Sequence, residues 1–165
     1  MASYCILGGT GFVGSRLIAH LANRGHRITV PTRDPERARH LRVQPSVGIV
    51  RADVHAPGTL AGLLGGSDAV INLIGILNES GRDGRGFRRA HVELMQTLIT
   101  ACGSAGVSRV IQISALNAGA PQARSHYLRS KGEAEALLRA APLDWTILQP
   151  SVIYGPGDAF LNRFA

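Results

Sequence analysis

A glycine-rich segment near the amino terminus constrains the fold more than any other feature of the chain. The sequence Gly8-Gly9-Thr10-Gly11-Phe12-Val13-Gly14 follows the apolar run Tyr4 to Leu7 and opens a segment, Phe12 to Arg24, with apolar residues at helical spacing. In such a strand–turn–helix unit, Gly8 permits the tight turn, Gly11 lets the backbone approach a pyrophosphate, and Gly14 lets helix and strand pack closely. The pattern predicts a dinucleotide site at the start of the first helix. The alternative is a structural turn that binds no ligand. The candidate phosphate-binding residues are Gly8, Thr10, Gly11, Phe12, Val13 and Gly14.

Short apolar runs alternate with helix-periodic segments along the rest of the chain. We expect further strands at 27–30, 47–50, 69–73, 109–113 and 145–148. We expect helices at 34–41, 59–64, 87–105 and 126–140, and a mobile loop at 81–86, which is rich in glycine and arginine. Asp34 is the expected N-cap of the helix at 34–41. Repeated β–α alternation predicts an α/β fold with a doubly wound parallel sheet, a Rossmann fold of three α/β/α layers. Residues 1–165 are expected to form a single NAD(P)-binding domain.

The end of the second expected strand lacks the acidic residue that many dinucleotide folds place there. A carboxylate about 20 residues beyond the glycine loop binds the adenosine ribose hydroxyls, whereas this chain reads Val30-Pro31-Thr32-Arg33. Loss of that carboxylate removes its repulsion of a 2′-phosphate, and a guanidinium binds such a phosphate bidentately. Thr32 and Arg33 therefore favour NADP(H) over NAD(H), unless Arg33 simply faces solvent. Asp53, followed by Val54 at the end of the third strand, is placed either to accept from the adenine amino group or to cap a helix.

A second group of residues has the spacing of an acid/base site. Ser114 follows the strand at 109–113, and Tyr127 and Lys131 lie four residues apart on the helix at 126–140, so that they share one helix face. A nearby ammonium group and a positively charged nicotinamide favour the phenolate form of tyrosine, which makes Tyr127 a candidate acid/base. Ser114 would then orient the substrate oxygen. Lys131 is the only lysine of the chain, and it stands at the spacing that this chemistry requires; the alternative is a solvated surface lysine.

The positive charge of the chain invites a nucleic-acid interpretation. The formal net charge is +7, but the arginines are spread along the sequence without a dense block, so we expect no nucleic-acid partner. Cys5 and Cys102 are isolated and lack ligand-like spacing to histidine, so no metal site is expected. No apolar run reaches the roughly 18–20 residues of a membrane helix, and no charged leader precedes the first strand. The chain is therefore expected to be cytoplasmic and not membrane-spanning.

The motifs together resemble one superfamily. The glycine loop, Ser114, the Tyr127–Lys131 pair and the segment from Leu148 to Gly157 are similar to the extended and atypical short-chain dehydrogenase/reductases of the NAD-dependent epimerase/dehydratase type. Ser114 to Ala118 followed by Tyr127 to Lys131 most resembles bacterial relatives of the NAD(P)H-binding accessory subunit of respiratory complex I. The resemblance implies that Ser114, Tyr127 and Lys131 form a catalytic triad and that Lys131 also binds the nicotinamide ribose. Further cofactor contacts are implied at Asn72, Leu73, Ile74, Gly75, Pro150, Ser151 and Val152. A respiratory-complex or quinone-related partner, at the periphery of the inner membrane, is implied as well.

Two features depart from this resemblance. Epimerase relatives carry asparagine in the helix after the fourth strand, where this chain has His91. That difference argues against a standard proton relay through this helix, although His91 is equally consistent with a partly buried ring whose nitrogens are satisfied. Relatives also continue beyond the motif at Tyr154 into a lobe that closes over the substrate, so a C-terminal substrate lobe is expected to be missing from the sequence that ends at Ala165.

Three functions follow from these residues. The favoured hypothesis is an NAD(P)H-binding oxidoreductase or epimerase that transfers a hydride with Tyr127 as acid/base, on a small-molecule substrate that the sequence does not identify. The alternative is a non-catalytic NADPH-binding subunit or assembly factor of a respiratory or quinone-related complex. A basic nucleic-acid-binding module is the third hypothesis.

Overall fold

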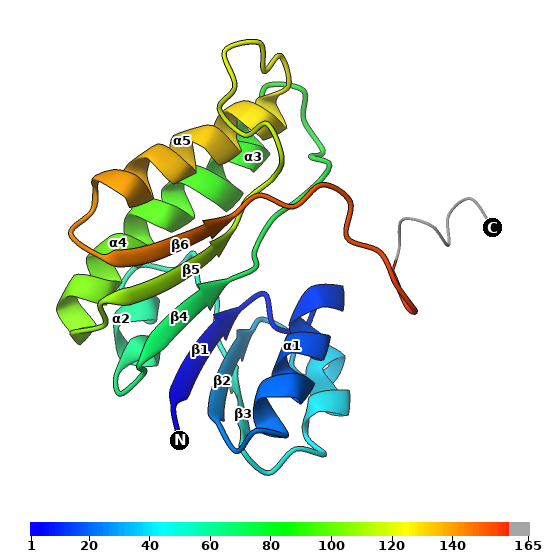
Figure 1. Ribbon diagram of the computed structural model, residues 1–165, viewed down its shortest axis with the longest axis vertical. Helices are drawn as coiled ribbons and strands as arrows, with labels where there is room; N and C mark the ends of the chain where they lie inside the picture. The colour runs from blue at the N-terminus through cyan, green and yellow to red at the C-terminus, as the bar shows by residue number, and fades with distance from the viewer. Residues whose placement is uncertain (159–165) are drawn as a thin grey trace.

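The computed structural model describes residues 1–158, which form a six-stranded parallel sheet flanked by helices (Figure 1). The strands are β1 (Ser3–Leu7), β2 (Arg27–Thr32), β3 (Val47–Arg51), β4 (Ala69–Asn72), β5 (Arg109–Ile113) and β6 (Asp144–Leu148). The helices are α1 (Phe12–Ala22), the 3₁₀-helix η1 (Pro35–Leu41), α2 (Thr59–Leu64), α3 (Arg85–Phe87), the π-helix η2 (Arg88–Glu93), α4 (Leu94–Ala105) and α5 (His126–Ala140). Within residues 1–158 no helix has the length and apolar character needed to cross a bilayer.

Strand order places the ligand crevice. The sheet runs β3-β2-β1-β4-β5-β6 with every pair parallel. Strands β2 and β3 are added on one side of β1, and β4, β5 and β6 are added on its other side, so the order of the strands switches between β1 and β4. Leu7 pairs with Asn72 at the carboxyl ends of those two strands. The helices that follow β1 and β4 leave in opposite directions at this point and open a crevice there. The predicted doubly wound parallel sheet is confirmed.

Two apolar cores, one on each face of the sheet, account for the three layers. Successive side chains of a strand point to opposite faces, and β1 shows this directly. Cys5 and Leu7 belong to a core under α2, α4 and α5, whereas Ile6 belongs to a separate core under α1 and η1. All three side chains have no exposed surface. Figure 1 shows these two groups of helices on opposite faces of the sheet. The α/β/α arrangement is therefore confirmed.

One local prediction is wrong in an instructive way. The single helix expected at 87–105 is interrupted by the π-helix η2, in which Ala90, His91 and Val92 are all buried. The loop at 81–86, expected to be mobile, is tied to Glu79, whose carboxylate oxygens accept from the amides of Gly84 and Gly86, both at 2.8 Å. A half-buried carboxylate therefore satisfies two backbone donors of this loop.

A contact between two glycines joins the loop after β5 to helix α5. Gly119 has a left-handed backbone, with φ of 69°, and its amide donates to the carbonyl of Leu128 at 3.1 Å. A side-chain carbon on Gly132 would collide with the backbone of Gly119. The loop and the helix therefore approach each other as closely as backbones do, and this approach brings Ser114 near Lys131.

We expect Gly132→Ala to destabilise the fold. The added methyl group meets backbone rather than a movable side chain, so overpacking should lower the free energy of unfolding by about 1–3 kcal/mol despite the better helix propensity of alanine. Gly103→Ala in α4 is the matched control, because nothing lies within 4 Å of its added carbon; it should raise stability by about 0.5 kcal/mol. Urea unfolding of both variants tests the contact, and equal stability of the two would contradict it.

Candidate functional site

The glycine loop presents unpaired backbone donors at the start of α1. Gly8 turns the chain with φ of 76°, and the amide of Gly11 donates to the carbonyl of Gly8 at 3.1 Å. Gly11 is the N-cap of α1, and among the described residues no side chain caps this helix. The first amides of a helix are free in that situation and attract anions, an effect that the helix dipole reinforces. The loop is thus suited to a pyrophosphate.

Gly14 sets how closely α1 approaches this loop. A side-chain carbon at Gly14 would lie 2.6 Å from Gly9 Cα and 2.7 Å from the carbonyl oxygen of Gly8. Both distances are far below van der Waals contact, and the atoms concerned are backbone atoms that have no room to move aside. Glycine is therefore required at this position, as the sequence pattern predicts.

A cavity of about 400 Å³ lies beside the loop at the carboxyl ends of β2 and β3. Arg33 and Arg37 are exposed at its wall, and Thr32 and Asp34 stand on either side of Arg33 in the chain. Of the predicted cofactor residues, those that line this cavity are Gly8, Thr10, Gly11, Thr32, Arg33, Asp53, Val54, Leu73, Ile74 and Gly75. Sequence reasoning missed Arg37, and it assigned Asp34 only a capping role.

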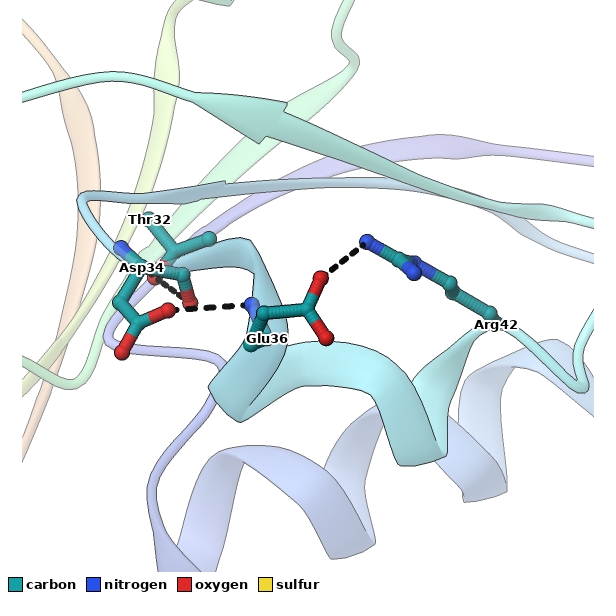
Figure 2. A network of polar contacts seen from close by, with 4 residues as sticks. All are labelled: Thr32, Asp34, Glu36 and Arg42. Atoms are coloured by element: carbon teal, nitrogen blue, oxygen red, sulfur yellow. Dashed lines mark hydrogen bonds and ion pairs between the residues drawn. The ribbon is translucent and has the colours of Figure 1, made fainter.

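Figure 2 shows the hydrogen bonds and the ion pair that the polar residues after β2 form with one another. The Thr32 hydroxyl donates to the carbonyl of Asp34 at 3.1 Å and lies 3.2 Å from the Asp34 amide. The Asp34 carboxylate accepts from the amide of Glu36 at 3.1 Å, which confirms it as the N-cap of η1. Glu36 in turn pairs with Arg42 at 3.5 Å. The turn therefore keeps one carboxylate, that of Asp34, at the cavity wall beside two arginines.

Asp53 and Asn72 have partners within the protein. An Asp53 carboxylate oxygen accepts from the amide of His55 at 3.0 Å, so one oxygen shapes the turn after β3 while the residue still lines the cavity. Asn72 lies beneath the crevice and is 2% exposed. Its amide donates to Gln112 at 2.8 Å and its oxygen accepts from the amide of Ile74 at 3.1 Å. Asn72 thus fixes the end of β4 and lines neither of the two cavities described here.

A second cavity, of about 470 Å³, lies at the carboxyl ends of β4 and β5 and against α5. Predicted residues that line it are Gly8, Gly11, Phe12, Val13, Gly14, Leu73, Gly75, Ser114, Tyr127, Lys131, Pro150, Ser151 and Val152. The two cavities share Gly8, Gly11, Leu73, Gly75 and Ile76. They therefore form one groove along the carboxyl edge of the sheet, with the glycine loop at its middle. Sequence reasoning missed the apolar wall residues Ile76, Leu77 and Ile153.

The structure brings Ser114, Tyr127 and Lys131 to the same end of this groove. The Ser114 hydroxyl is buried and has no hydrogen-bond partner within residues 1–158, an arrangement that is costly unless a ligand or water completes it. Lys131 is 5% exposed, and its ammonium group donates to the carbonyl of Ile113 at 3.2 Å. The N-cap of α5 is Ser125, whose hydroxyl accepts from the amide of Leu128 at 3.1 Å. The cap lies two residues before Tyr127, which is therefore the second residue of the helix.

Burial moves the protonation equilibria of this group toward neutral forms. It lowers the pKa of Lys131 from 10.5 to about 8, against the smaller opposing effect of Glu135. It also raises the pKa of the Tyr127 phenol above 10.0. The expectation that the ammonium group of Lys131 favours the phenolate is therefore outweighed by desolvation in the protein without a bound ligand. Tyr127 holds its proton near neutral pH.

Comparison with known proteins identifies relatives of the whole described chain. A family model described as NAD(P)H-binding matches residues 8–158. The chain is 33% identical over 164 residues to "NADH dehydrogenase (ubiquinone) 1 alpha subcomplex subunit 9, mitochondrial" of Mus musculus, covering 97% of this chain and 43% of the relative. It is 35% identical over 156 residues to the ceramide reductase of Caulobacter vibrioides, covering 93% of this chain and 47% of the relative. The chain thus spans less than half the length of these curated relatives.

Solved structures agree with the sequence matches. The structure of MoeE5 in complex with UDP-glucuronic acid and NAD superposes with a TM-score of 0.83 at 28% identity, covering 98% of this chain and 59% of that one. The resemblance to the NAD-dependent epimerase/dehydratase type and to the complex I subunit is therefore confirmed. NAD(P)H is the class of cofactor that these matches support.

The shifted pKa of Lys131 predicts a pH dependence of stability. The unfolded chain keeps the lysine proton up to about pH 10.5, whereas the folded protein releases it near pH 8. The unfolded state therefore binds more protons between these values, and stability should rise with pH by about 2 kcal/mol between pH 7 and 9.5 from this group alone. Urea unfolding of the wild type and of Lys131→Met isolates the effect, because the other titrating groups are common to both. Between pH 7 and 9.5 the free energy of unfolding of the wild type should gain that amount relative to Lys131→Met. If the two free energies changed in parallel with pH, the burial of a titrating Lys131 would be contradicted.

Proposed function

Because the chain belongs to the NAD(P)H-binding family, we propose that it is a short-chain-dehydrogenase-like reductase domain that holds NADP(H) along the groove and reduces a carbonyl substrate with Tyr127 as proton donor. The observation that carries the proposal is the buried Ser114 hydroxyl without a partner among the described residues, beside Tyr127 and Lys131 in a cavity continuous with the glycine loop. When bound, the reduced cofactor supplies the hydride.

The residues of the groove suit such a cofactor. The uncapped start of α1 offers amides to the pyrophosphate, and the open side of Gly11 admits it closely. The cavity at β2 and β3 has room for the adenosine end, and the cavity against α5 receives the nicotinamide end near Pro150 and Val152. In this assignment Lys131, held by the carbonyl of Ile113, binds the nicotinamide ribose.

The protonation states favour reduction over oxidation. A phenol whose pKa is raised by burial is protonated near neutral pH and donates its proton as negative charge develops on a carbonyl oxygen. Ser114 donates a second hydrogen bond to the same oxygen, and a preorganised donor of this kind stabilises the developing charge. Lys131, with a pKa near 8, is close to the range in which it can return a proton to Tyr127.

The second candidate is a non-catalytic subunit that binds NADPH within a respiratory or quinone-related assembly. The observation in its favour is the likeness to subunits of NADH dehydrogenase (ubiquinone), which includes the 40 kDa subunit of NADH-ubiquinone oxidoreductase from Neurospora crassa at 27% identity. In that case the groove holds the cofactor as a structural element, and the protein sits beside a membrane-bound partner.

Tyr127→Phe separates the two candidates. For a reductase we expect transfer of deuterium from labelled NADPH to the carbonyl carbon of a benzaldehyde probe to fall by about 10²–10⁴-fold, because the general acid is lost. NADPH affinity should stay within a few-fold, since the phenylalanine ring keeps the packing. A wild type that retains NADPH stoichiometrically through purification and transfers no label supports the structural role. Full activity in the variant would overturn the assignment of Tyr127.

The preference for NADP(H) depends on the arginines at the first cavity. Two guanidinium groups, of Arg33 and Arg37, line this cavity together with the carboxylates of Asp34 and Asp53, each of which already accepts from a backbone amide. Arg33→Ala should weaken NADPH binding by about tenfold and leave NADH binding nearly unchanged, since a charge-assisted hydrogen bond contributes about 1.5–3 kcal/mol. Arg39→Ala is the control, because Arg39 is exposed on η1 and does not line the cavity. Fluorescence titration measures both, and equal affinities that the mutation leaves unaltered would remove the preference.

A further inference from the structure

His91 lies between the loop after β4 and helix α5 and contacts both. Its Nδ1 is 2.8 Å from the Ser130 hydroxyl oxygen, and its Nε2 is 3.4 Å from the amide nitrogen of Ile76. The residue is 4% exposed. It reaches this position from η2, and π-helical turns of this kind are frequent at functional sites.

Hydrogen-bond directions fix the tautomer of the ring. The single hydroxyl hydrogen of Ser130 donates to the carbonyl of Tyr127 at 2.9 Å. Ser130 is therefore an acceptor toward His91, and Nδ1 must carry the hydrogen. Nε2 is then the unprotonated nitrogen, and it accepts from the amide of Ile76. One neutral imidazole thus satisfies a donor on the loop and an acceptor on the helix.

The surroundings keep this ring neutral. The rings of Phe87 and Tyr127 pack around it, with centroids at 6.1 and 5.7 Å. Burial, and then the charge of Lys131, lower the pKa of His91 to about 3. A protonated ring would direct an Nε2 hydrogen at the Ile76 amide and place a second cation near Lys131. The neutral ring required by the hydrogen bonds is therefore also the protonation state that the electrostatics favour.

Gly75 places Lys131 at the same junction. A side-chain carbon on Gly75 would lie 3.1 Å from Lys131 Nζ and 3.6 Å from His91 Nε2. Both nitrogens therefore border the backbone of the loop that joins the two halves of the groove. The separation of this loop from α5 determines how much water reaches the ammonium group.

We propose that His91 is a positioning residue that ties the loop after β4, through the amide of Ile76, to the helix that carries Tyr127 and Lys131, and so keeps water away from the Lys131 ammonium group. The inference rests on the proposed function, in which the loop holds the cofactor and the helix holds the acid/base pair. In this role His91 takes the place of a polar relay residue without exchanging a proton itself.

The chain offers a direct probe of this tie, because Lys131 is its only lysine. Labelling with ¹³Cε-lysine gives one side-chain signal whose shift reports the Lys131 titration. The other charged or titratable groups around Lys131 are Glu135, one turn further along α5, Tyr127, and the His91 ring, which stays neutral across the titration. The measurement uses neither substrate nor cofactor, so its outcome is independent of whether hydride transfer occurs.

His91→Phe keeps a ring in the cluster and removes both hydrogen bonds. We expect the Lys131 pKa to rise by about one unit from its value near 8, because release of the loop lets water reach the ammonium group. His91→Asn retains a donor at the position of Nδ1 but does not reach Ile76, and it should raise the pKa similarly. His40→Phe, on the exposed η1, is the control and should leave the titration unchanged.

Ser130→Ala tests the same tie from the helix side and serves if the His91 variants do not fold. It should raise the Lys131 pKa in the same direction, and combining it with His91→Phe should add little, as expected for two partners of one link. A packing role alone predicts that His91→Phe leaves the Lys131 pKa within a few tenths of a unit of the wild-type value. That result, or an unchanged titration in Ser130→Ala, would overturn the proposal.

Discussion

Close approach of backbone to backbone at two contacts between glycines is the constraint on which the groove depends. Gly14 seats the first turn of α1 on Gly8 and Gly9, and Gly132 seats α5 on Gly119. The first contact fixes where the free amides of α1 point, and the second fixes Ser114 against the helix that carries Lys131. Because interiors are packed as densely as crystals, a single methyl group at either contact has nowhere to go. The middle of the groove and its α5 end are therefore positioned by the absence of side chains as much as by their presence.

Desolvation is the second organising effect, and it acts on Lys131, His91 and Tyr127 at the α5 end of the groove. It lowers the pKa of Lys131 and His91 and raises that of Tyr127. Each group thereby shifts toward its neutral form, as expected where burial outweighs the attraction between partners. A neutral phenol beside a lysine close to its own midpoint is an arrangement suited to moving one proton. The same exclusion of water makes it costly that the buried Ser114 hydroxyl has no hydrogen-bond partner among the described residues.

Much of the fold was predictable, because strand and helix periodicity and the glycine spacing are properties of the local sequence. Tyr127 and Lys131 were predictable as a pair for the same reason, since four residues of helix bring them to one face. Features that depend on tertiary contacts were not. The role of Asn72 beneath the crevice needs Gln112 from a neighbouring strand, and two backbone donors of the loop at 81–86 need Glu79. Arg37 reaches the cavity from η1, whose position against the sheet is a tertiary feature. The reversal of the expected phenolate follows from burial, which no spacing reveals.

The π-helix η2 has a consequence for how this chain is compared with others. A π-turn holds one residue more than an α-turn, so it is equivalent to a single-residue insertion that the helix absorbs without a loop. Residues before and after Arg88–Glu93 are therefore out of phase by about 100° relative to an unbroken α-helix. A relative without the π-turn presents a different position to Tyr127, even where the two sequences align without a gap. Equivalence of His91 with the asparagine of epimerase relatives is thus a question of helical phase, which superposed side chains decide and counted residues do not.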